Sequence, residues 1–362
     1  MDERLYWHAF NQVPHIGAAR IQQLVTTFGS LSIAWQASES TLRRSGLSAN
    51  ALSALLTNRS RLDLAAEEAK LQRLGVRLMI HTDADYPQDL ARVNDAPAVL
   101  YVRGCLLPED NLALAIVGTR RATRYGRDAA QTIARQLASR GVTIVSGLAL
   151  GIDTAAHEGA LEAGGRTIAV LGSGIDVTYP RENSSLAERI TDNGALITEF
   201  PPGTPPTGPN FPRRNRILSG LSLGVLVAEA PIQSGALITA ETALDQGREV
   251  FAIPANIFNK MGQGCNRLIQ EGATLVMHAG DILDALNIAY VRVTTRHTTE
   301  QAAPDSDFER QILTLLENDP IHIDDLIRKS GLAAEQVSAA LVLLELKGLA
   351  QTNGPMEYSR TR

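Results

Sequence analysis

A repeating pattern between residues 112 and 290 constrains the fold of this chain most. Short apolar runs of strand length, such as Leu112–Val117 and Gly224–Ala228, alternate with stretches of helical periodicity. Continuously apolar strands are typical of a parallel sheet that crossover helices bury on both faces. The pattern predicts an α/β domain with a doubly wound, Rossmann-like parallel sheet. The other strand-length runs are Val142–Val145, Thr167–Leu171, Ala195–Thr198, Glu249–Ile253 and Thr274–Met277.

The flanking segments predict further domains in this chain of 362 residues. Residues 1–80 show helical spacing throughout and predict a small all-α domain, either a SAM-like or helix-hairpin-helix-like module or one that contacts protein. Residues 82–290 comprise the Rossmann-like domain with a lead-in segment at its edge. Residues 291–306 are polar and aperiodic, which indicates a linker. Residues 307–362 hold three short helical patterns followed by a β-hairpin pattern, an order that predicts a winged helix.

The composition limits how this chain could bind a polyanion. Its formal net charge of −5 argues against a protein that coats nucleic acid by bulk positive charge. Only four of its 34 basic residues are lysine, and arginine favours bidentate phosphate contacts and stacking on bases. A GC-rich genome would give the same bias, so the composition alone leaves both interpretations open.

The chain carries no sign of export or of membrane insertion. Cys105 and Cys265 lie far apart and suggest no disulfide framework. The N-terminus lacks a basic region followed by an apolar run, and no stretch is long enough to span a bilayer. We therefore expect a cytoplasmic protein without a membrane partner.

The loops after the strands are the first places to look for a site, because ligands bind at the carboxyl ends of strands in an open parallel sheet. Several of these loops are rich in small residues, which let a ligand approach the backbone N–H groups. Ser234 and Gly235 open a later helix, where the first N–H groups have no partner within the helix. The residues of the earlier loops that we expect to contact an anion are Gly118, Thr119, Arg120, Gly147, Gly172, Ser173, Gly174, Arg181 and Asn183.

A basic cluster lies within Phe211–Ser219, after a loop rich in proline and glycine and at the predicted start of a helix. Guanidinium forks and free N–H groups at a helix start can hold several phosphate oxygens together. Glu199 and Glu229 end neighbouring strands, so pairing of some of these arginines with a carboxylate is the alternative. The cluster consists of Arg213, Arg214, Asn215 and Arg216.

No pattern of catalytic or cofactor-binding residues emerges from the sequence. The loop that begins at Gly118 lacks the G-x-G-x-x-G pattern of a dinucleotide site, and the chain has no Gly-Lys pair for a phosphate-binding Walker loop. No Cys/His cluster has the spacing of a metal site. We therefore expect a binding protein that is not an enzyme and has no cofactor and no metal.

The ordered motifs of the sheet region resemble one known family, the DNA-processing protein A (DprA/Smf) family. Two positions depart from its usual pattern, because Ala236 stands in place of a serine and Cys265 in place of a serine or threonine. The motifs that carry the resemblance include Ile116–Arg120, Ser146–Ala149, Gly151–Asp153, Leu171–Gly174, Tyr179–Pro180, Arg214–Ile217, Glu229–Ala230 and Val250–Ala252.

The resemblance implies a cytoplasmic bacterial protein that binds single-stranded DNA. Such a protein protects incoming strands during natural transformation, helps to load the RecA recombinase onto them, and forms a homodimer through the sheet domain. By motif, Arg120 and Arg181 would be basic contacts to the strand, with Arg214, Arg216 and Arg248 beside them. Contacts of this kind bind without sequence readout and weaken with salt.

Aromatic side chains that could stack on bases are few, since aromatic residues make up 4% of the chain. Tyr125, Tyr179 and Phe211 are the candidates. A nucleotide-binding enzyme or sensor of the lysine-decarboxylase-like Rossmann type is the alternative function, although its Pro-Gly-Gly-x-Gly-Thr signature is missing. The predicted recognition helix of the winged helix carries no lysine or arginine over Ala334–Ala340, which favours contact with protein over duplex DNA.

Overall fold

The structure is a computed structural model that describes residues 2–288, 306–316, 320–346, 349–354 and 356–360. The chain forms two compact units, Met1–Val293 and Thr294–Arg362. The predicted linker over residues 291–306 lies outside the described residues except for Ser306.

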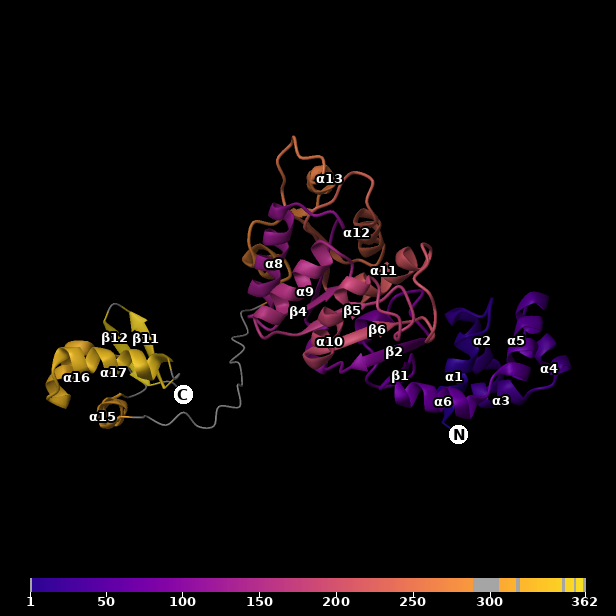
Figure 1. The fold of residues 1–362 in the computed structure, drawn as a ribbon, viewed down its shortest axis with the longest axis horizontal. Helices are drawn as coiled ribbons and strands as arrows, with labels where there is room; N and C mark the ends of the chain where they lie inside the picture. The colour runs from indigo at the N-terminus through magenta and orange to yellow at the C-terminus, as the bar shows by residue number, and fades with distance from the viewer. Residues whose placement is uncertain (1, 289–305, 317–319, 347–348, 355, 361–362) are drawn as a thin grey trace. The chain divides into compact units, whose positions relative to one another are not determined.

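The first part of unit 1 is helical (Figure 1). The side chains of Asp2, Ser30, Ser38, Ser48 and Asp63 each accept a hydrogen bond from a first-turn N–H group, which fixes where five of these helices begin. The helices are α1 (Glu3–Asn11), α2 (Ala18–Phe28), α3 (Leu31–Gln36), α4 (Glu39–Arg44), α5 (Ala49–Arg61) and α6 (Leu64–Arg73).

A sheet of nine strands in the order β1-β2-β6-β5-β4-β3-β7-β8-β9 forms the rest of unit 1. The strands from β6 to β9 in this order are parallel, whereas β1 and β2 add an antiparallel edge. The strands are β1 (Arg77–Ile80), β2 (Val99–Gly104), β3 (Ala113–Val117), β4 (Thr143–Ser146), β5 (Thr167–Val170), β6 (Gly194–Thr198), β7 (Gly224–Val227), β8 (Glu249–Ala252) and β9 (Thr274–Leu275).

Helices cover both faces of this sheet (Figure 1). Strand β3 is apolar throughout because both of its faces are buried. Leu114 and Ile116 pack with α8, α9 and α14, while Ala115 and Val117 pack with α11, α12 and α13. The helices are α7 (Gln88–Ala91), α8 (Arg124–Ala138), α9 (Ile152–Glu162), α10 (Ser184–Asp192), α11 (Asn210–Gly220), α12 (Gly235–Asp245), α13 (Gln263–Gln270) and α14 (Ala279–Ala285), with 3₁₀ turns η1 (Pro108–Asn111) and η2 (Arg181–Asn183).

Unit 2 is a small domain with helices on a three-stranded sheet of order β10-β12-β11. Its core includes Leu326, Val337, Leu341 and Leu344. The fold class is confirmed: a Rossmann-like sheet follows a helical segment and precedes a winged helix. The elements of unit 2 are α15 (Asp307–Leu315), β10 (Ile321–His322), α16 (Ile323–Ser330), α17 (Ala334–Leu346), β11 (Ala350–Gly354) and β12 (Glu357–Arg360).

The helical prediction for residues 1–80 is wrong at its end. Residues Arg77–Ile80 form strand β1, which pairs with β2 from the lead-in segment. Leu78, Met79 and Ile80 are all buried, so this short run is apolar on both faces, as in the inner strands.

Candidate nucleic-acid interface

A pocket opens where the strand order reverses, at the carboxyl ends of β3 and β7. Strand β4 lies on one side of β3 and β7 on the other, which makes this the topological switch point of the sheet. The pocket has a volume of about 350 Å³ and is bounded by the loops after β3 and β7, by α11 and by the first turn of α12. The predicted residues that line it are Gly118, Thr119, Arg120, Arg214, Asn215, Ser234 and Gly235.

Arg214 of α11 is the buried basic group of this pocket, with 5% of its surface exposed. Its Nη2 donates to the carbonyl of Gly147 at 3.2 Å, and its Nε has no hydrogen-bond partner. A Cβ at position 147 would collide with the guanidinium, so the glycine gives it room. Burial lowers the pKa of Arg214 to about 10, which leaves the group charged at neutral pH.

Asp153 is the carboxylate near this guanidinium, and it is itself buried. It accepts hydrogen bonds from the N–H groups of Gly147 at 3.1 Å and Ala149 at 3.3 Å, so it also fixes the loop after β4. Burial raises the pKa of Asp153, and the charge of Arg214 opposes that shift. None of the described residues forms an ion pair with Arg214, which leaves its charge only partly compensated.

Arg120, Phe211 and Tyr179 form a stack at the rim. The guanidinium carbon of Arg120 lies 4.9 Å from the centre of the Phe211 ring, and the rings of Phe211 and Tyr179 are 5.9 Å apart. Phe211 fits there because position 172 is glycine: a Cβ would lie 2.8 Å from the Phe211 ring. Arg120 and Tyr179 are both exposed, so the stack presents a cation and an aromatic face to solvent.

A carboxylate of the protein occupies the N-terminus of α8, the first helix after β3. Glu229, which follows β7, is 1% exposed. It accepts hydrogen bonds from the N–H of Thr123 at 2.7 Å, from the Thr123 hydroxyl at 2.8 Å and from the amide of Asn259 at 3.2 Å. In a dinucleotide-binding sheet this helix N-terminus receives the pyrophosphate. Glu229 fills that position, which explains in physical terms why the loop after Gly118 lacks the dinucleotide pattern.

The N-terminus of α12 faces the pocket instead. Ser234 caps this helix of 11 residues, since its hydroxyl accepts from the N–H of Ala236 at 3.2 Å. Ser234, Gly235 and Ala236 all line the cavity, so the positive end of the helix dipole points toward the same space as Arg214.

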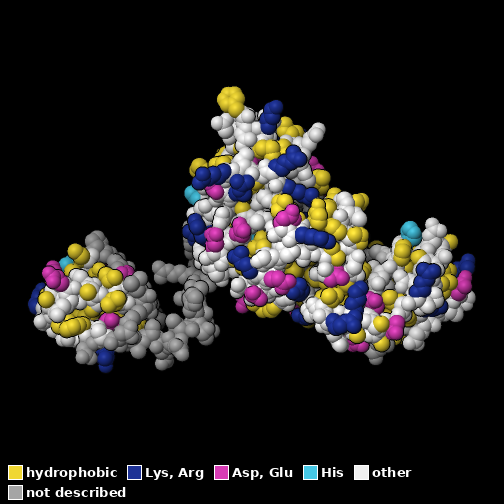
Figure 2. Space-filling view, in the orientation of Figure 1, with side chains coloured by type: hydrophobic (Ala, Val, Ile, Leu, Met, Phe, Trp, Pro, Cys, Tyr) yellow, Lys and Arg dark blue, Asp and Glu magenta, His cyan; other side chains and the backbone are white. Residues whose placement is uncertain are grey.

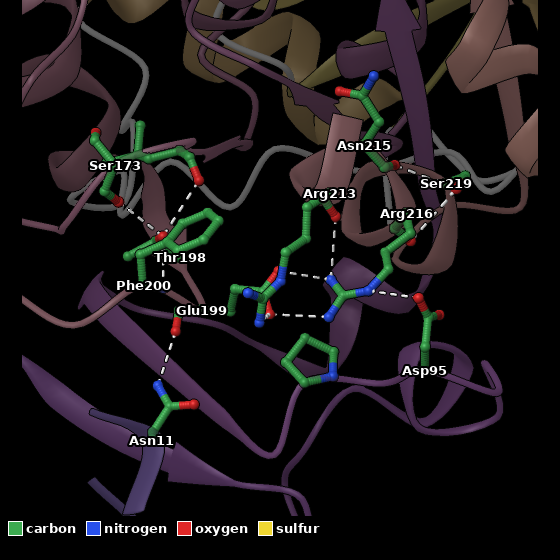
Figure 3. A network of polar contacts seen from close by, with 12 residues as sticks. Asn11, Asp95, Ser173, Thr198, Glu199, Phe200, Arg213, Asn215, Arg216 and Ser219 are labelled. Atoms are coloured by element: carbon green, nitrogen blue, oxygen red, sulfur yellow. Dashed lines mark hydrogen bonds and ion pairs between the residues drawn. The ribbon is translucent and has the colours of Figure 1, made fainter. Parts of the chain in front are cut away.

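Arg213 and Arg216 do not share the position of Arg214. Both pair with Glu199 at the end of β6: Arg213 at 2.7 Å, and Arg216 through two bonds of 2.8 and 2.9 Å (Figure 3). Arg216 also pairs with Asp95 at 2.8 Å, and Asn11 of α1 donates to the Glu199 carbonyl at 2.9 Å. For these two arginines the alternative of carboxylate pairing holds, and we assign them a structural role. That they also line the strand path stays a prediction.

Other predicted residues also act within the fold. The guanidinium of Arg248 donates to the carbonyls of Asp89 and Gly220, away from the switch point. The amide of Asn183 donates to the carbonyl of Leu148 at 2.8 Å, which holds two carboxyl-end loops together.

The turn after β5 is likewise tied into the fold, since its three predicted residues, Gly172, Ser173 and Gly174, are all buried. Ser173 donates to the carbonyl of Val177 at 2.6 Å. A Cβ at Gly174 would lie 2.7 Å from the Pro201 carbonyl, so this glycine allows two loops to pack closely. Arg181 differs from these residues, because it is exposed on η2 close to Tyr179.

Some pocket residues lie outside the predicted set. Gln233 and Thr239 line the cavity through the β7–α12 loop and α12, and nothing in their local sequence distinguishes them. Tyr179 and Phe211 were candidates only as aromatic residues; their contact joins segments more than 30 residues apart in the chain. On the face shown in Figure 2, basic and acidic side chains are interspersed, so positive charge on that face is local.

Two further features of the structure bear on the class of site. Across the part of the chain that the structure describes, no group of three or more His, Cys, Asp or Glu side chains could hold a metal ion. Within that same part, no helix has the length and apolar character needed to cross a bilayer.

Comparison with known proteins identifies the family. The model of the DNA recombination-mediator protein A family matches residues 77–287, more than half of the chain, and that of the DprA winged helix domain matches residues 296–354. The chain belongs to the DprA/Smf family. Its membership places it among DNA-processing proteins.

Individual relatives agree with the DprA/Smf assignment. Protein Smf from Synechocystis is 34% identical over 393 residues, a match that covers 99% of both chains. The X-ray structure of DprA from Streptococcus pneumoniae aligns with a TM-score of 0.65 at 35% identity, covering 78% of this chain and 98% of that one. The structure of DprA from Helicobacter pylori, reported for its single-stranded DNA binding mode, aligns at 0.52 and 30% identity over 59% of this chain and all of that one.

Proposed function

We propose that this protein binds single-stranded DNA at the pocket between β3 and β7, without reading its sequence. The observation that carries the proposal is Arg214, a buried guanidinium with an unsatisfied Nε, beside the exposed Arg120 at the switch point. A buried charge that lacks a full set of partners is costly, so a site of this kind favours an anion. Phosphate contacts by arginine and by helix N–H groups give affinity that is independent of base sequence.

The rim stack supports a single strand over a duplex. Bases are accessible for stacking only when unpaired, and stacking on an aromatic side chain contributes about 1–3 kcal/mol per base. Tyr179 is 44% exposed and packs against Phe211, and the Arg120 guanidinium lies over the Phe211 ring. A phosphate at Arg120 and Arg214 therefore places the neighbouring base near an aromatic surface.

A charge reversal at the rim tests this assignment. Arg120→Glu removes an exposed cation that no described carboxylate pairs with, so we expect the affinity for labelled oligo-dT to fall by more than tenfold in fluorescence anisotropy titrations. Arg135→Glu is the control, because Arg135 is also exposed but lies in the last turn of α8, where it pairs with Glu162 at 3.9 Å. Equal losses in the two variants would mean that general charge, and not this site, determines binding.

The biological role that we propose is non-enzymatic. Membership of the family supports protection of incoming strands during transformation and loading of RecA onto them in the cytoplasm. Both steps need a protein that holds a strand tightly without cutting it. A nuclease-protection assay, followed by RecA-dependent joint-molecule formation on the same strand, tests them, with the Arg120→Glu variant expected to fail in both.

We also propose that the sheet domain forms a homodimer through the groove between α12 and α13. Ile232, Ile238 and Leu244 are 50%, 44% and 60% exposed there, a concentration of apolar surface that is typical of an interface. The charged residues of the groove are Glu241, Arg267 and Glu271, so both signs are present, which suits a surface that meets its own copy. Light scattering should show a dimer for the natural chain and a monomer for Leu244→Glu.

The exposed side chains of the winged helix favour contact with a protein partner. Val342 and Leu343 of α17 are 54% and 44% exposed, so this helix presents apolar side chains to solvent. A protein partner would cover such a surface, whereas a duplex would meet it with phosphates. Deleting residues 294–362 should therefore leave oligo-dT affinity unchanged.

A further inference from the structure

The switch-point pocket brings two groups that favour an anion, a helix N-terminus and a buried guanidinium, to one cavity. Of the two helix N-termini that flank the switch point, that of α8 already holds the carboxylate of Glu229. The N-terminus of α12 lines the pocket through Ser234 and Gly235, and Arg214 lines the same cavity. An anion that satisfies both groups must enter the pocket itself, because Arg214 is only 5% exposed.

The charge of the pocket exceeds that of an internal phosphate. Arg120, Arg121 and Arg214 contribute three positive charges, and Asp153 is the only carboxylate among the pocket's lining residues. The helix N-terminus adds about half a positive charge. The excess is therefore about two and a half positive charges. A phosphodiester within a strand carries one negative charge, whereas a phosphomonoester carries about −1.5 to −2 at neutral pH.

The size of the pocket also favours a terminal phosphate over an internal one. Its volume of about 350 Å³ lies at the small end of ligand pockets, which range over roughly 300–1,000 Å³. An internal phosphate continues into a sugar on both sides, so both neighbours must fit or bend away before the phosphate reaches a buried guanidinium. A terminal phosphate continues on one side alone, toward the rim where Arg120, Phe211 and Tyr179 lie.

We propose that this pocket takes a terminal phosphomonoester, as carried by a phosphorylated strand end or by a nucleoside monophosphate. The inference rests on the proposed function, because it assigns the pocket to the same DNA strand. The phosphate contacts Arg214 and the first turn of α12, and the adjoining nucleotide lies along the Arg120 rim. Strand ends then bind more tightly than strand interiors.

A competition experiment on the full chain tests this inference. A 3′-labelled dT15 strand is displaced, at one salt concentration, by unlabelled dT15 with a 5′-hydroxyl, a 5′-phosphate or a 3′-phosphate, and by dTMP. We expect a phosphorylated end to compete at least about fivefold better than the hydroxyl end. The 5′-, 3′- and mononucleotide arms distinguish which source of the monoester the pocket prefers. A dT16 strand with hydroxyl ends controls for the added charge and should compete like dT15.

Variants of Arg214 complete the test. Arg214→Gln should weaken binding of hydroxyl-ended dT15 and also reduce the advantage of the phosphorylated end to about onefold, whereas Arg214→Lys should retain part of that advantage. A thermal melt of each variant checks that it is folded; the comparison of strand ends in the natural chain does not depend on any variant. Equal competition by phosphorylated and hydroxyl ends in the natural chain would overturn the inference and leave the proposed function standing. Failure of every strand to bind would instead overturn the proposed function.

Discussion

Replacing Arg216 should destabilise the protein far more than it changes the intrinsic affinity for a strand. The Arg216 guanidinium makes two bonds of 2.8 and 2.9 Å to Glu199, whose side chain is 4% exposed. Removing one partner of a buried ion pair costs about 3–5 kcal/mol, because the other charge stays buried. Arg213 still pairs with Glu199 in the Arg216→Ala variant, so we expect the lower end, about 3 kcal/mol.

This loss should be visible as a shift in the melting temperature. For domains of 150–250 residues each kcal/mol lowers it by about 2–4 °C, which gives a fall of about 6–12 °C. Circular dichroism melts of the natural chain and of Arg216→Ala measure it, and anisotropy titrations well below both transitions measure strand affinity. Affinity there should change by less than about threefold.

Two further variants separate the ion pair from other effects. Arg213→Ala removes the half-exposed partner, whose side chain is 54% accessible, and should cost no more than about 1 kcal/mol. Glu199→Gln combined with Arg216→Met leaves no unpaired charge and should recover most of the lost stability. If Arg216→Ala melted like the natural chain yet bound oligo-dT more than tenfold more weakly, Arg216 would be a strand contact and the structural role assigned to it would be wrong.

Two other predictions concern buried groups near the site. Burial lowers the pKa of His157 to about 3. Between pH 6.5 and 5 this histidine is therefore protonated in the unfolded chain and neutral in the folded chain. The free energy of unfolding should fall by about 1.4 kcal/mol per pH unit, or about 2 kcal/mol between pH 6.5 and 5. Urea titrations at both pH values should show this loss in the natural chain and less of it in His157→Asn, and parallel losses would refute the assignment. Glu229→Ala leaves the N-terminus of α8 without its anion, so it should lower oligo-dT affinity by loosening the loop that carries Arg120. Added sulfate should raise the melting temperature of this variant more than that of the natural chain, and an unchanged melting temperature in sulfate would count against the anion-like role of Glu229.

The sheet was predictable because its strands are buried on both faces. Runs such as Gly224–Ala228 are apolar without alternation, and few structures other than a covered parallel sheet satisfy them. Strand β1 escaped prediction because a run of four residues next to a helical segment carries too little pattern to assign.

The arginine cluster could have been divided from the sequence alone. Arg213 and Arg216 are three residues apart and share one face of α11, whereas Arg214 and Arg216 are two apart and point in different directions. Once a helix is expected to begin before the cluster, the three arginines of the cluster cannot all line the same side of one site. What the sequence could not supply was the partner on each face, since Glu199 and Gly147 lie in distant segments that only the sheet brings together.

Single-strand and duplex affinities measured against salt concentration test the central claim most directly. We predict that oligo-dT binds more tightly than a duplex of equal length and that the logarithm of its affinity falls linearly with the logarithm of salt. Replacing Arg120 by Gln should reduce that slope by about 0.7, the value of one phosphate contact on a single strand, while Arg135→Gln leaves it unchanged. A duplex that binds as well as the single strand, or a slope that Arg120→Gln does not alter, would contradict the account.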